Sequence, residues 1–479
     1  MSETSPTKPE ERAKDTYKLD WSQGPSVTHH QLGDLKYTVT VGLLPVNDEF
    51  GEPEAAMFYT AYTKDGETDP SKRPLMFSFN GGPGSSSVWL HLGAVGPKRV
   101  VLAPEGFQPA PPFRLEDNPQ TWLHHADLVF IDPVGTGYSR PVKKESEKKF
   151  WSLAGDVASV GEFIRLYLSR SERWSSPLYL VGESYGTTRA AGLAGDLIGK
   201  GIAFNGLILV SSILNFQTTR FTKGNDLPFE LFLPSYTATA WYHGKLPHFP
   251  TLAGALKAAE DFVQDSYGKI LHEGDRLSAE DHAEAIQKLV ELTGLDPEYV
   301  DQADLRIQIH RFCKELLRDE KLTVGRLDSR YKGLDANYVG EVPEHDPSNS
   351  AILPAYTAGI NDLLQRSYGW KTDMPYFVFN PGDLWKSWTY GDAGQGFPDT
   401  SESLRAAISK NPHMRVMIAS GYYDLATPYF ATEYTLAHLG LAPAVRQNIS
   451  THFYEAGHMM YVHEECLQKL ATDVASFIR

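Results

Sequence analysis

One serine in the chain has the flanking residues that a catalytic nucleophile requires. Ser184 stands at the centre of the pentapeptide GESYG, which matches the pattern G-x-S-x-G. In this pattern the serine occupies a strained turn between a strand and a helix, and the small flanking residues let neighbouring chains approach closely. The pentapeptide alone is a weak signal, but the apolar segment 177–181 precedes it and the alanine-rich segment 187–199 follows it. The context therefore predicts a strand–turn–helix unit that exposes a nucleophilic hydroxyl.

A carboxylate and an imidazole follow later strand-like segments. Asp424 lies just after RVMIASG, and His458 follows STHFYEAG near the C-terminus. The order serine, acid, histidine is the one that accompanies this nucleophile motif. A serine hydroxyl attacks well when an imidazole accepts its proton, and a carboxylate holds that imidazole in the correct tautomer. We predict Ser184 as nucleophile, His458 as general base and Asp424 as the residue that orients the base.

A glycine-rich segment, NGGPGSSS at residues 80–87, directly follows another strand-like segment. A phosphate-binding loop would close with Gly-Lys-Ser or Gly-Lys-Thr, which this segment lacks. The alternative is an oxyanion hole, in which backbone N–H groups stabilise the tetrahedral intermediate. The predicted donors are the N–H groups of Gly82 and Tyr185.

Metal chemistry has little support in the sequence. The chain has no His-Glu-x-x-His pattern, and the His-Glu-Glu segment at 463–465 lacks ligand spacing. We expect neither a metal ion nor an organic cofactor.

The segments that must position these residues are short, rich in Val and Leu, and end in Gly- or Asp-rich turns. Examples are PLMFSFNGG, ADLVFIDPVG, PLYLVGES and GLILVSS. Such segments, alternating with helical stretches, are typical of a parallel sheet covered by helices. Two β-rich stretches between Leu35 and Lys64 predict antiparallel strands at the sheet edge. The fold class is therefore α/β, of the α/β-hydrolase type with a mostly parallel central sheet.

The pattern changes at about Phe216, where the chain becomes largely helical and charged. Segments such as 251–271 have apolar residues at helical spacing, and strand-like segments return with PYFVFN. An insertion at this point would cover the C-terminal edge of the sheet, where ligands bind in open α/β folds. We predict a flexible tail over 1–25, a first core part over 26–215, a mainly helical cap over 216–368 and a second core part over 369–479.

Composition narrows the range of partners. The chain has 479 residues and a net charge of −15, with 41% hydrophobic and 22% charged residues. The negative charge disfavours a nucleic-acid groove, and no segment approaches the ~18–20 consecutive apolar residues of a membrane-spanning helix. We expect neither nucleic acid nor a membrane as partner, and the oligomeric state stays open.

The N-terminal segment and the cysteines bear on localisation. The start, MSETSPTKPEERAKD, has no apolar core of a secretory signal, so the chain as written is expected in the cytoplasm. If a signal peptide has been removed, the protein is secreted or periplasmic. Cys313 and Cys466 allow at most one disulfide, and two free thiols explain their number equally well.

Five motifs together carry a family resemblance. The combination of NGGPGSSS, DLVFIDPVGTGYS, LVGESYGTTRAAGLA, GYYDLATP and AGHMMY resembles the serine carboxypeptidase family, the S10 peptidases. The resemblance runs from about residue 75 to 465, apart from the helical insertion. It implies hydrolysis of C-terminal residues from peptides with a free C-terminus, through an acyl-enzyme intermediate. It also implies that Asn80, Gly81 and Glu183 bind the terminal carboxylate of the substrate.

The proposed role of Glu183 has a consequence for pH. Two ionised carboxylates cannot share a hydrogen bond, so Glu183 would act in its protonated form, with a raised pKa. We therefore expect peptide hydrolysis to favour mildly acidic pH.

The chain departs from the family pattern at three places. Ala94 replaces a second glutamate that the family usually carries, which predicts a smaller proton-sharing network. Ser85 stands where many relatives have a disulfide-forming cysteine, which favours a bacterial member. After His458 the family often reads Met-Val-Pro, and this chain reads MMY.

Two alternatives stay open. An acyltransferase or an esterase would use the same three residues and differ in the group that accepts the acyl chain. A non-catalytic binding protein on the same fold is a third interpretation, which the intact serine, aspartate and histidine set disfavours.

Overall fold

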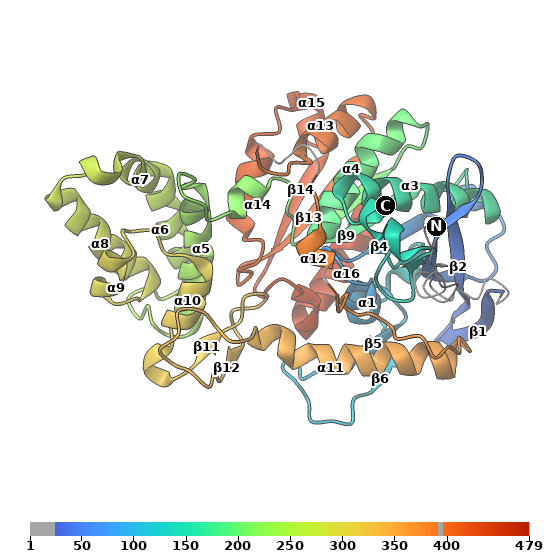
Figure 1. Ribbon diagram of the computed structural model, residues 1–479, viewed down its shortest axis with the longest axis horizontal. Coiled ribbons are helices and arrows are strands. Elements are labelled where there is room, and N and C mark those ends of the chain that lie inside the picture. The colour runs from blue at the N-terminus through green and yellow to red at the C-terminus, as the bar shows by residue number, and fades with distance from the viewer. Residues whose placement is uncertain (1–23, 383, 391–395, 479) are drawn as a thin grey trace, which may run out of the picture.

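The computed structural model describes residues 24–382, 384–390 and 396–478 (Figure 1). Most of the predicted tail, residues 1–23, lies outside this part of the chain. In the described part, a central sheet of ten strands runs through the molecule.

The central sheet has an antiparallel edge and a parallel body. At the edge, β1 (Ser26–Leu32), β2 (Leu35–Asn47) and β3 (Pro53–Lys64) pair antiparallel, and β8 (Arg140–Pro141) joins the end of β3. The body runs in the order β7 (Asp127–Ile131), β4 (Leu75–Phe79), β9 (Leu178–Glu183), β10 (Gly206–Val210), β13 (Arg415–Gly421) and β14 (Ile449–Tyr454). All five pairings within this body are parallel. The predicted α/β fold with a mostly parallel sheet is confirmed.

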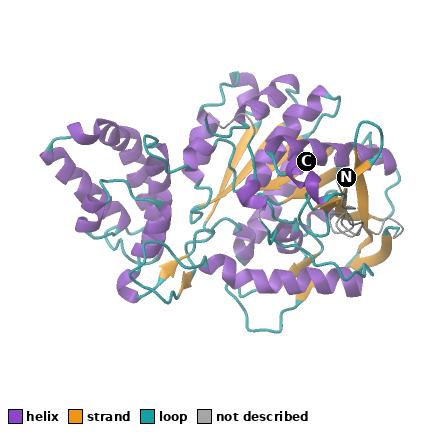
Figure 2. Cartoon of the chain, in the orientation of Figure 1, coloured by secondary structure: helices purple, strands orange, loops and turns teal. Residues whose placement is uncertain are grey.

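Helices cover both faces of the sheet (Figure 2), which explains why strands such as β4 and β7 are buried along their whole length. One face packs against α3 (Leu153–Arg170), α4 (Tyr185–Gly199) and α13 (Ser401–Lys410). The other face packs against α11 (Pro347–Asp362) and α16 (Glu464–Ile478). Burial on both faces removes the need for alternating polar residues, as the uniformly apolar segments indicated.

A separate apolar cluster lies in the helical lobe beside the sheet (Figure 1). It contains side chains such as Phe232, Tyr236, Leu289 and Phe312. The lobe is built from α5 (Leu227–Tyr242), α6 (Leu252–Phe262), α7 (Gly268–Glu273), α8 (Ala279–Thr293), α9 (Pro297–Gln302) and α10 (Ile309–Glu315).

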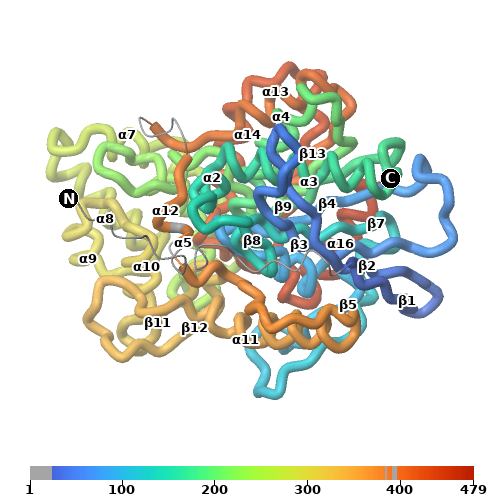
Figure 3. Tube along the Cα trace, turned by 45° about the vertical axis from the view of Figure 1, so that its right-hand side comes forward, coloured from blue at the N-terminus to red at the C-terminus, as the bar shows by residue number. Residues whose placement is uncertain are grey.

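Helix α11 packs differently from the rest of the predicted cap. It runs beside β5 (Lys98–Val100) (Figure 3), and its Tyr356 ring lies 4.8 Å from the ring of Trp89 in the core. Its apolar side chains belong to the same cluster as the sheet. The sequence did not predict this packing, because a helical apolar pattern indicates a buried face without identifying what covers it. The division into core and cap stays a proposal, and this packing would shorten the cap to about residues 216–324.

The two cysteines do not pair. Cys313 in α10 and Cys466 in α16 are both buried free thiols. Within the residues that the structure describes, no helix is long and apolar enough to cross a membrane.

Candidate active site

Ser184 occupies the turn between β9 and α4. Its backbone has φ 60° and ψ −131°, a conformation that residues other than glycine rarely adopt. The Ser184 N–H donates to the Val210 carbonyl of β10 at 3.0 Å, and the Ser184 carbonyl accepts from the Thr187 N–H at 2.8 Å. These contacts hold the strained turn that the motif predicted.

The two flanking glycines are required by close backbone contacts. A Cβ at Gly182 would lie 2.2 Å from the Gly186 carbonyl oxygen, and a Cβ at Gly186 would lie 2.9 Å from the Phe79 carbonyl oxygen. Neither position therefore accepts a side chain without movement of the backbone. The spacing of the G-x-S-x-G pattern follows directly from this packing.

Asp424 is fully buried in the turn after β13, where four donors surround its carboxylate. The backbone N–H groups of Ala426 and Thr427 donate to Oδ1 at 2.7 and 3.0 Å. The Thr427 hydroxyl donates to Oδ2 at 2.7 Å, and His458 Nδ1 lies 2.7 Å from the same oxygen. Thr427 was not predicted as a site residue, although the Asp-x-x-Thr spacing within GYYDLATP is a signal for it.

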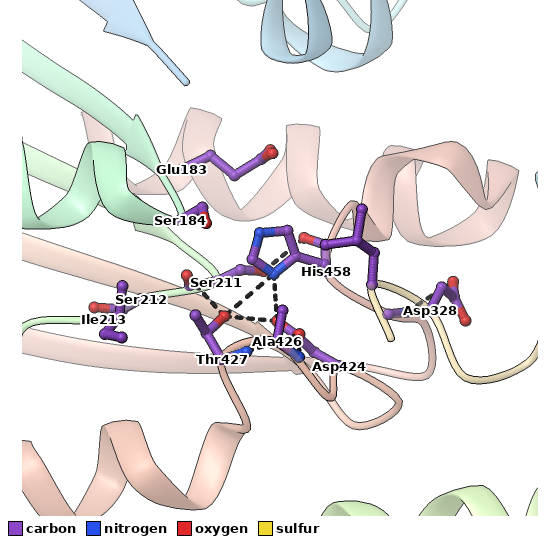
Figure 4. A network of polar contacts seen from close by, with 12 residues as sticks. Glu183, Ser184, Ser211, Ser212, Ile213, Asp328, Asp424, Ala426, Thr427 and His458 are labelled. Carbon is purple, nitrogen blue, oxygen red and sulfur yellow. Dashed lines mark hydrogen bonds and ion pairs between the residues drawn. The ribbon is translucent and has the colours of Figure 1, made fainter. Parts of the chain in front are cut away.

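His458 lies after β14, and the structure brings it together with Asp424 as predicted. Figure 4 shows the imidazole with Asp424 and Thr427 on one side and Ser184 and Glu183 on the other. Burial is the largest single effect and lowers the pKa of His458, but the neighbouring carboxylates of Asp424 and Glu183 together outweigh it, so the pKa is raised overall. The imidazole can therefore accept a proton and hold the resulting charge beside Asp424.

A loop that follows the helical lobe, residues 325–331, holds the backbone around the imidazole. The His458 N–H donates to the Leu327 carbonyl at 2.6 Å, and the Gly457 N–H donates to the Asp328 carboxylate at 3.1 Å. A Cβ at Gly457 would lie 2.4 Å from the Asp328 Cβ, so this contact requires glycine. No sequence signal linked this loop to the histidine.

A cavity of about 250 Å³ joins the predicted catalytic and carboxylate-binding residues. Its lining includes Ser184, His458, Asn80, Gly81, Gly82 and Glu183, with Trp89, Phe379 and Met459 on its apolar part. A larger cleft of about 700 Å³ also contains Ser184 in its lining, together with aromatic side chains that include Phe216, Phe221 and Phe232. Ser184 therefore borders two adjoining spaces.

The predicted oxyanion donors lie beside Ser184 in the larger cleft. Tyr185 is the first residue of α4, so its N–H has no acceptor within the helix. The Gly81 backbone lies so close that a Cβ there would be 2.4 Å from the Tyr185 nitrogen. The glycine-rich loop thus lies against the nucleophile turn, and Gly82 has a φ of 104° that glycine adopts readily.

Glu183 is a buried carboxylic acid with two hydrogen-bond donors. Asn80 Nδ2 donates to Oε1 at 2.9 Å, and the Tyr461 hydroxyl donates to Oε2 at 2.6 Å. Burial raises the pKa of Glu183 to about 7, and the Asp424 charge adds to the rise, while His458, Tyr461 and Asn80 oppose it. This direction agrees with the expectation that Glu183 acts in its protonated form.

Asn80 is held in place by one contact to its side chain and one to its backbone. Its Oδ1 accepts from the Leu90 N–H at 3.0 Å, and its carbonyl accepts from the Arg189 guanidinium at 2.7 Å. Its side-chain amide therefore faces Glu183 in a fixed orientation.

The expectation that Ala94 leaves a smaller proton-sharing network stays a prediction. Ala94 is fully buried among apolar residues, and Tyr461 supplies a hydrogen bond to Glu183. This tyrosine belongs to the MMY segment after His458, for which the sequence predicted no role. In the part of the chain that the structure describes, no group of three or more His, Cys, Asp or Glu residues could hold a metal ion.

The chain is similar to known serine carboxypeptidases. Residues 32–215 match the family model described as serine carboxypeptidase. Serine carboxypeptidase-like 8 of Arabidopsis thaliana is 32% identical over 158 residues, 32% of this chain and 33% of that protein. Serine carboxypeptidase-like 34 of the same plant is 24% identical over 85% of this chain and 75% of that protein.

Alignments with the first such relatives span only about a third of their length. Among solved structures, a prohormone-processing carboxypeptidase of Saccharomyces cerevisiae, Kex1, superposes with a TM-score of 0.56 at 16% identity, covering 92% of this chain and 91% of the other. At that identity the superposition shows a shared fold. Together with the motifs, the family match shows that residues 32–215 are similar to the serine carboxypeptidase family.

Proposed function

We propose that this protein is a serine carboxypeptidase that removes C-terminal residues from peptides. The observation that carries the proposal is a single cavity of about 250 Å³ lined by Ser184 and His458 and also by Asn80 and Glu183. A nucleophile beside a protonatable acid and an amide donor suits a substrate that ends in a carboxylate.

The proposed reaction follows from the placement of the groups. His458 accepts the hydroxyl proton of Ser184 while the serine oxygen attacks the carbonyl carbon of the last peptide bond. The N–H groups of Gly82 and Tyr185 stabilise the oxyanion. His458 then gives the proton to the leaving amine. In the second half, water attacks the acyl-enzyme while His458 accepts a proton from the water. His458 then returns this proton to the Ser184 oxygen as the acid product leaves.

The two adjoining spaces receive different parts of the substrate. The leaving C-terminal residue would occupy the smaller cavity, with its carboxylate toward Asn80, Gly81 and protonated Glu183. The acyl part would occupy the larger cleft, whose lining combines the core with helical-region residues such as Phe221, Phe232 and Ile309. Side chains of the helical region would therefore select the penultimate residue.

A digest of a synthetic peptide library, read by mass spectrometry, tests this function. We expect stepwise loss of single residues from free C-termini, no loss from the same peptides after C-terminal amidation, and no digestion by Ser184→Ala. Labelling of Ser184 by a serine-directed phosphonate establishes that the nucleophile is competent.

Two other results would replace the proposal. Transfer of the acyl group to an added alcohol in preference to water would make the protein an acyltransferase. Hydrolysis of small esters without any trimming of peptides would make it an esterase.

A further inference from the structure

Tyr461 contacts Glu183 from a part of the chain that the motifs did not connect with it. Tyr461 lies in the short 3₁₀ helix Met460–Val462, three residues after His458, and its side chain is 2% exposed. Its hydroxyl donates to Glu183 Oε2 at 2.6 Å, a short bond of the kind formed with an acidic oxygen. Tyr461 does not belong to the lining of the cavity, so it acts on a substrate only through Glu183.

The packing of the Tyr461 ring fixes where its hydroxyl lies. A Cβ at Gly93 would lie 2.3 Å from Cε2 of the ring and 2.7 Å from the Tyr356 hydroxyl. The ring thus fills the space that a side chain at position 93 would need. Because the aromatic ring is rigid and enclosed, the hydroxyl has one position, and that position faces Oε2.

We propose that Tyr461 is a positioning residue that orients the Glu183 carboxyl group toward the C-terminal carboxylate of the substrate. Tyr461 would also limit the highest pH at which Glu183 binds that carboxylate. The proposal rests on the carboxypeptidase function proposed above. The phenol donates to one oxygen of Glu183 and Asn80 to the other, so the carboxyl group is held at both ends. A group held in this way loses little freedom when a substrate binds.

The same two donors also decide how readily Glu183 loses its proton. Donors to a carboxylate favour its ionised form, so Tyr461 and Asn80 oppose the effect of burial. The other titratable groups that act on Glu183 are His458, Asp424 and Tyr356 of α11, and the charged side chains of Arg326 and Asp346 line the same cavity. Tyr461→Phe leaves these groups in place and removes the hydroxyl that contacts Glu183 and also interacts with the Asn80 amide.

Tyr461→Phe, compared with the wild type across pH, tests the proposal. The substrates are a blocked dipeptide with a free C-terminal carboxylate and the same dipeptide as its C-terminal amide. At pH 5.5 we expect the ratio of kcat/KM for acid to amide to fall about tenfold, mainly through KM. We also expect the alkaline midpoint of this ratio to move to higher pH, because Glu183 keeps its proton longer without the phenol donor.

A matched control is Tyr454→Phe. The Tyr454 hydroxyl donates to the Asp473 carboxylate at 2.7 Å, so the substitution removes the same type of bond outside the cavity. We expect this variant to keep the wild-type midpoint and the wild-type acid-to-amide ratio. Thermal unfolding of both variants measures any loss of stability separately from these ratios.

The outcomes separate the two proposals. A wild type that prefers the free acid, together with a Tyr461→Phe variant that keeps its ratio and its midpoint, overturns the role of Tyr461 alone. A ratio that falls without movement of the midpoint reduces Tyr461 to a packing residue and also overturns the role. A wild type that hydrolyses acid and amide equally at every pH overturns the carboxypeptidase function and this inference with it.

Discussion

Two buried carboxylates, Asp424 and Glu183, lie near the same imidazole and have different surroundings. Asp424 is contacted by four donors, two of them backbone N–H groups and one the His458 ring. Glu183 is contacted by two donors, and burial raises its pKa to about 7. Burial is the main cause of the raised pKa of Glu183, which suits this residue to proton donation, whereas the donors around Asp424 fix its carboxylate beside the imidazole.

The two acids also depend on different parts of the chain. The Asp424 donors come from its own turn and from the loop after the next strand, 34 residues later. Glu183 depends on Asn80 and Tyr461, which lie 103 and 278 residues away. A site assembled from distant segments can therefore lose the function of Glu183 while the set of Ser184, His458 and Asp424 stays intact.

The largest expected effect is on Asp424. Asp424→Asn removes the charge that holds the imidazole and favours the wrong tautomer, so kcat should fall on the order of 10⁴-fold. Both a small ester and a peptide should lose activity equally in steady-state kinetics. Asp473→Asn is the matched control, because Asp473 also lies beside a histidine and accepts a tyrosine hydroxyl outside the cavity. Equal losses in both variants would remove the distinction between Asp424 and an ordinary structural acid.

A second effect separates Glu183 from Asp424. Glu183→Ala removes a hydrogen bond to a charged group of the substrate, so kcat/KM for a free-acid peptide should fall about 100-fold, mostly through KM. Glu183→Gln keeps a donor that cannot ionise, so it should retain most activity at pH 5.5. Loss of small-ester hydrolysis equal to the peptide loss would show that Glu183 acts as part of the Asp424 network instead.

The third prediction concerns pH. Because the folded pKa of Glu183 is about 7, the proton is present below this pH and lost above it. The ratio of kcat/KM for a free-acid peptide to its amide should therefore be constant at acidic pH and fall about tenfold per pH unit above 7. Because the pKa of His458 is raised, the imidazole is already protonated at low pH and cannot accept the Ser184 proton. This moves the pH optimum of peptide hydrolysis from mildly acidic toward neutral. In Glu183→Gln the ratio should stay flat, and a fall in that variant would assign the alkaline limb to another group.

The smallest effect is on the support of Asp424. Thr427→Val keeps the shape of the side chain and removes one of four donors, so kcat should fall about fivefold for every substrate. Thr432→Val, which removes a hydroxyl bonded to the Ser212 carbonyl, is the control and should retain the wild-type rate. A loss above 100-fold in Thr427→Val would mean that the backbone donors alone cannot hold Asp424.

The sequence predicted the fold and the residues at the strand ends for a physical reason. Strands buried on both faces need continuous apolar segments, and the turn at Ser184 needs glycines at 182 and 186. Both features can therefore be recognised in the amino-acid sequence. The mainly helical character of 216–368 was also visible, but the packing of helix 347–362 against the core was not. The expectation of a bacterial member stays a prediction, as do the roles of the site residues.

What the sequence alone determined is the set of local shapes: which segments are strands, where the chain turns sharply and which reactive side chains stand at those turns. The tertiary structure decided which distant groups meet, namely Tyr461 with Glu183, Leu327 with His458 and Asp328 with Gly457. The reason is that periodicity and turn chemistry depend on neighbours in the chain, whereas the protonation and orientation of a buried acid depend on whichever donors the fold places beside it.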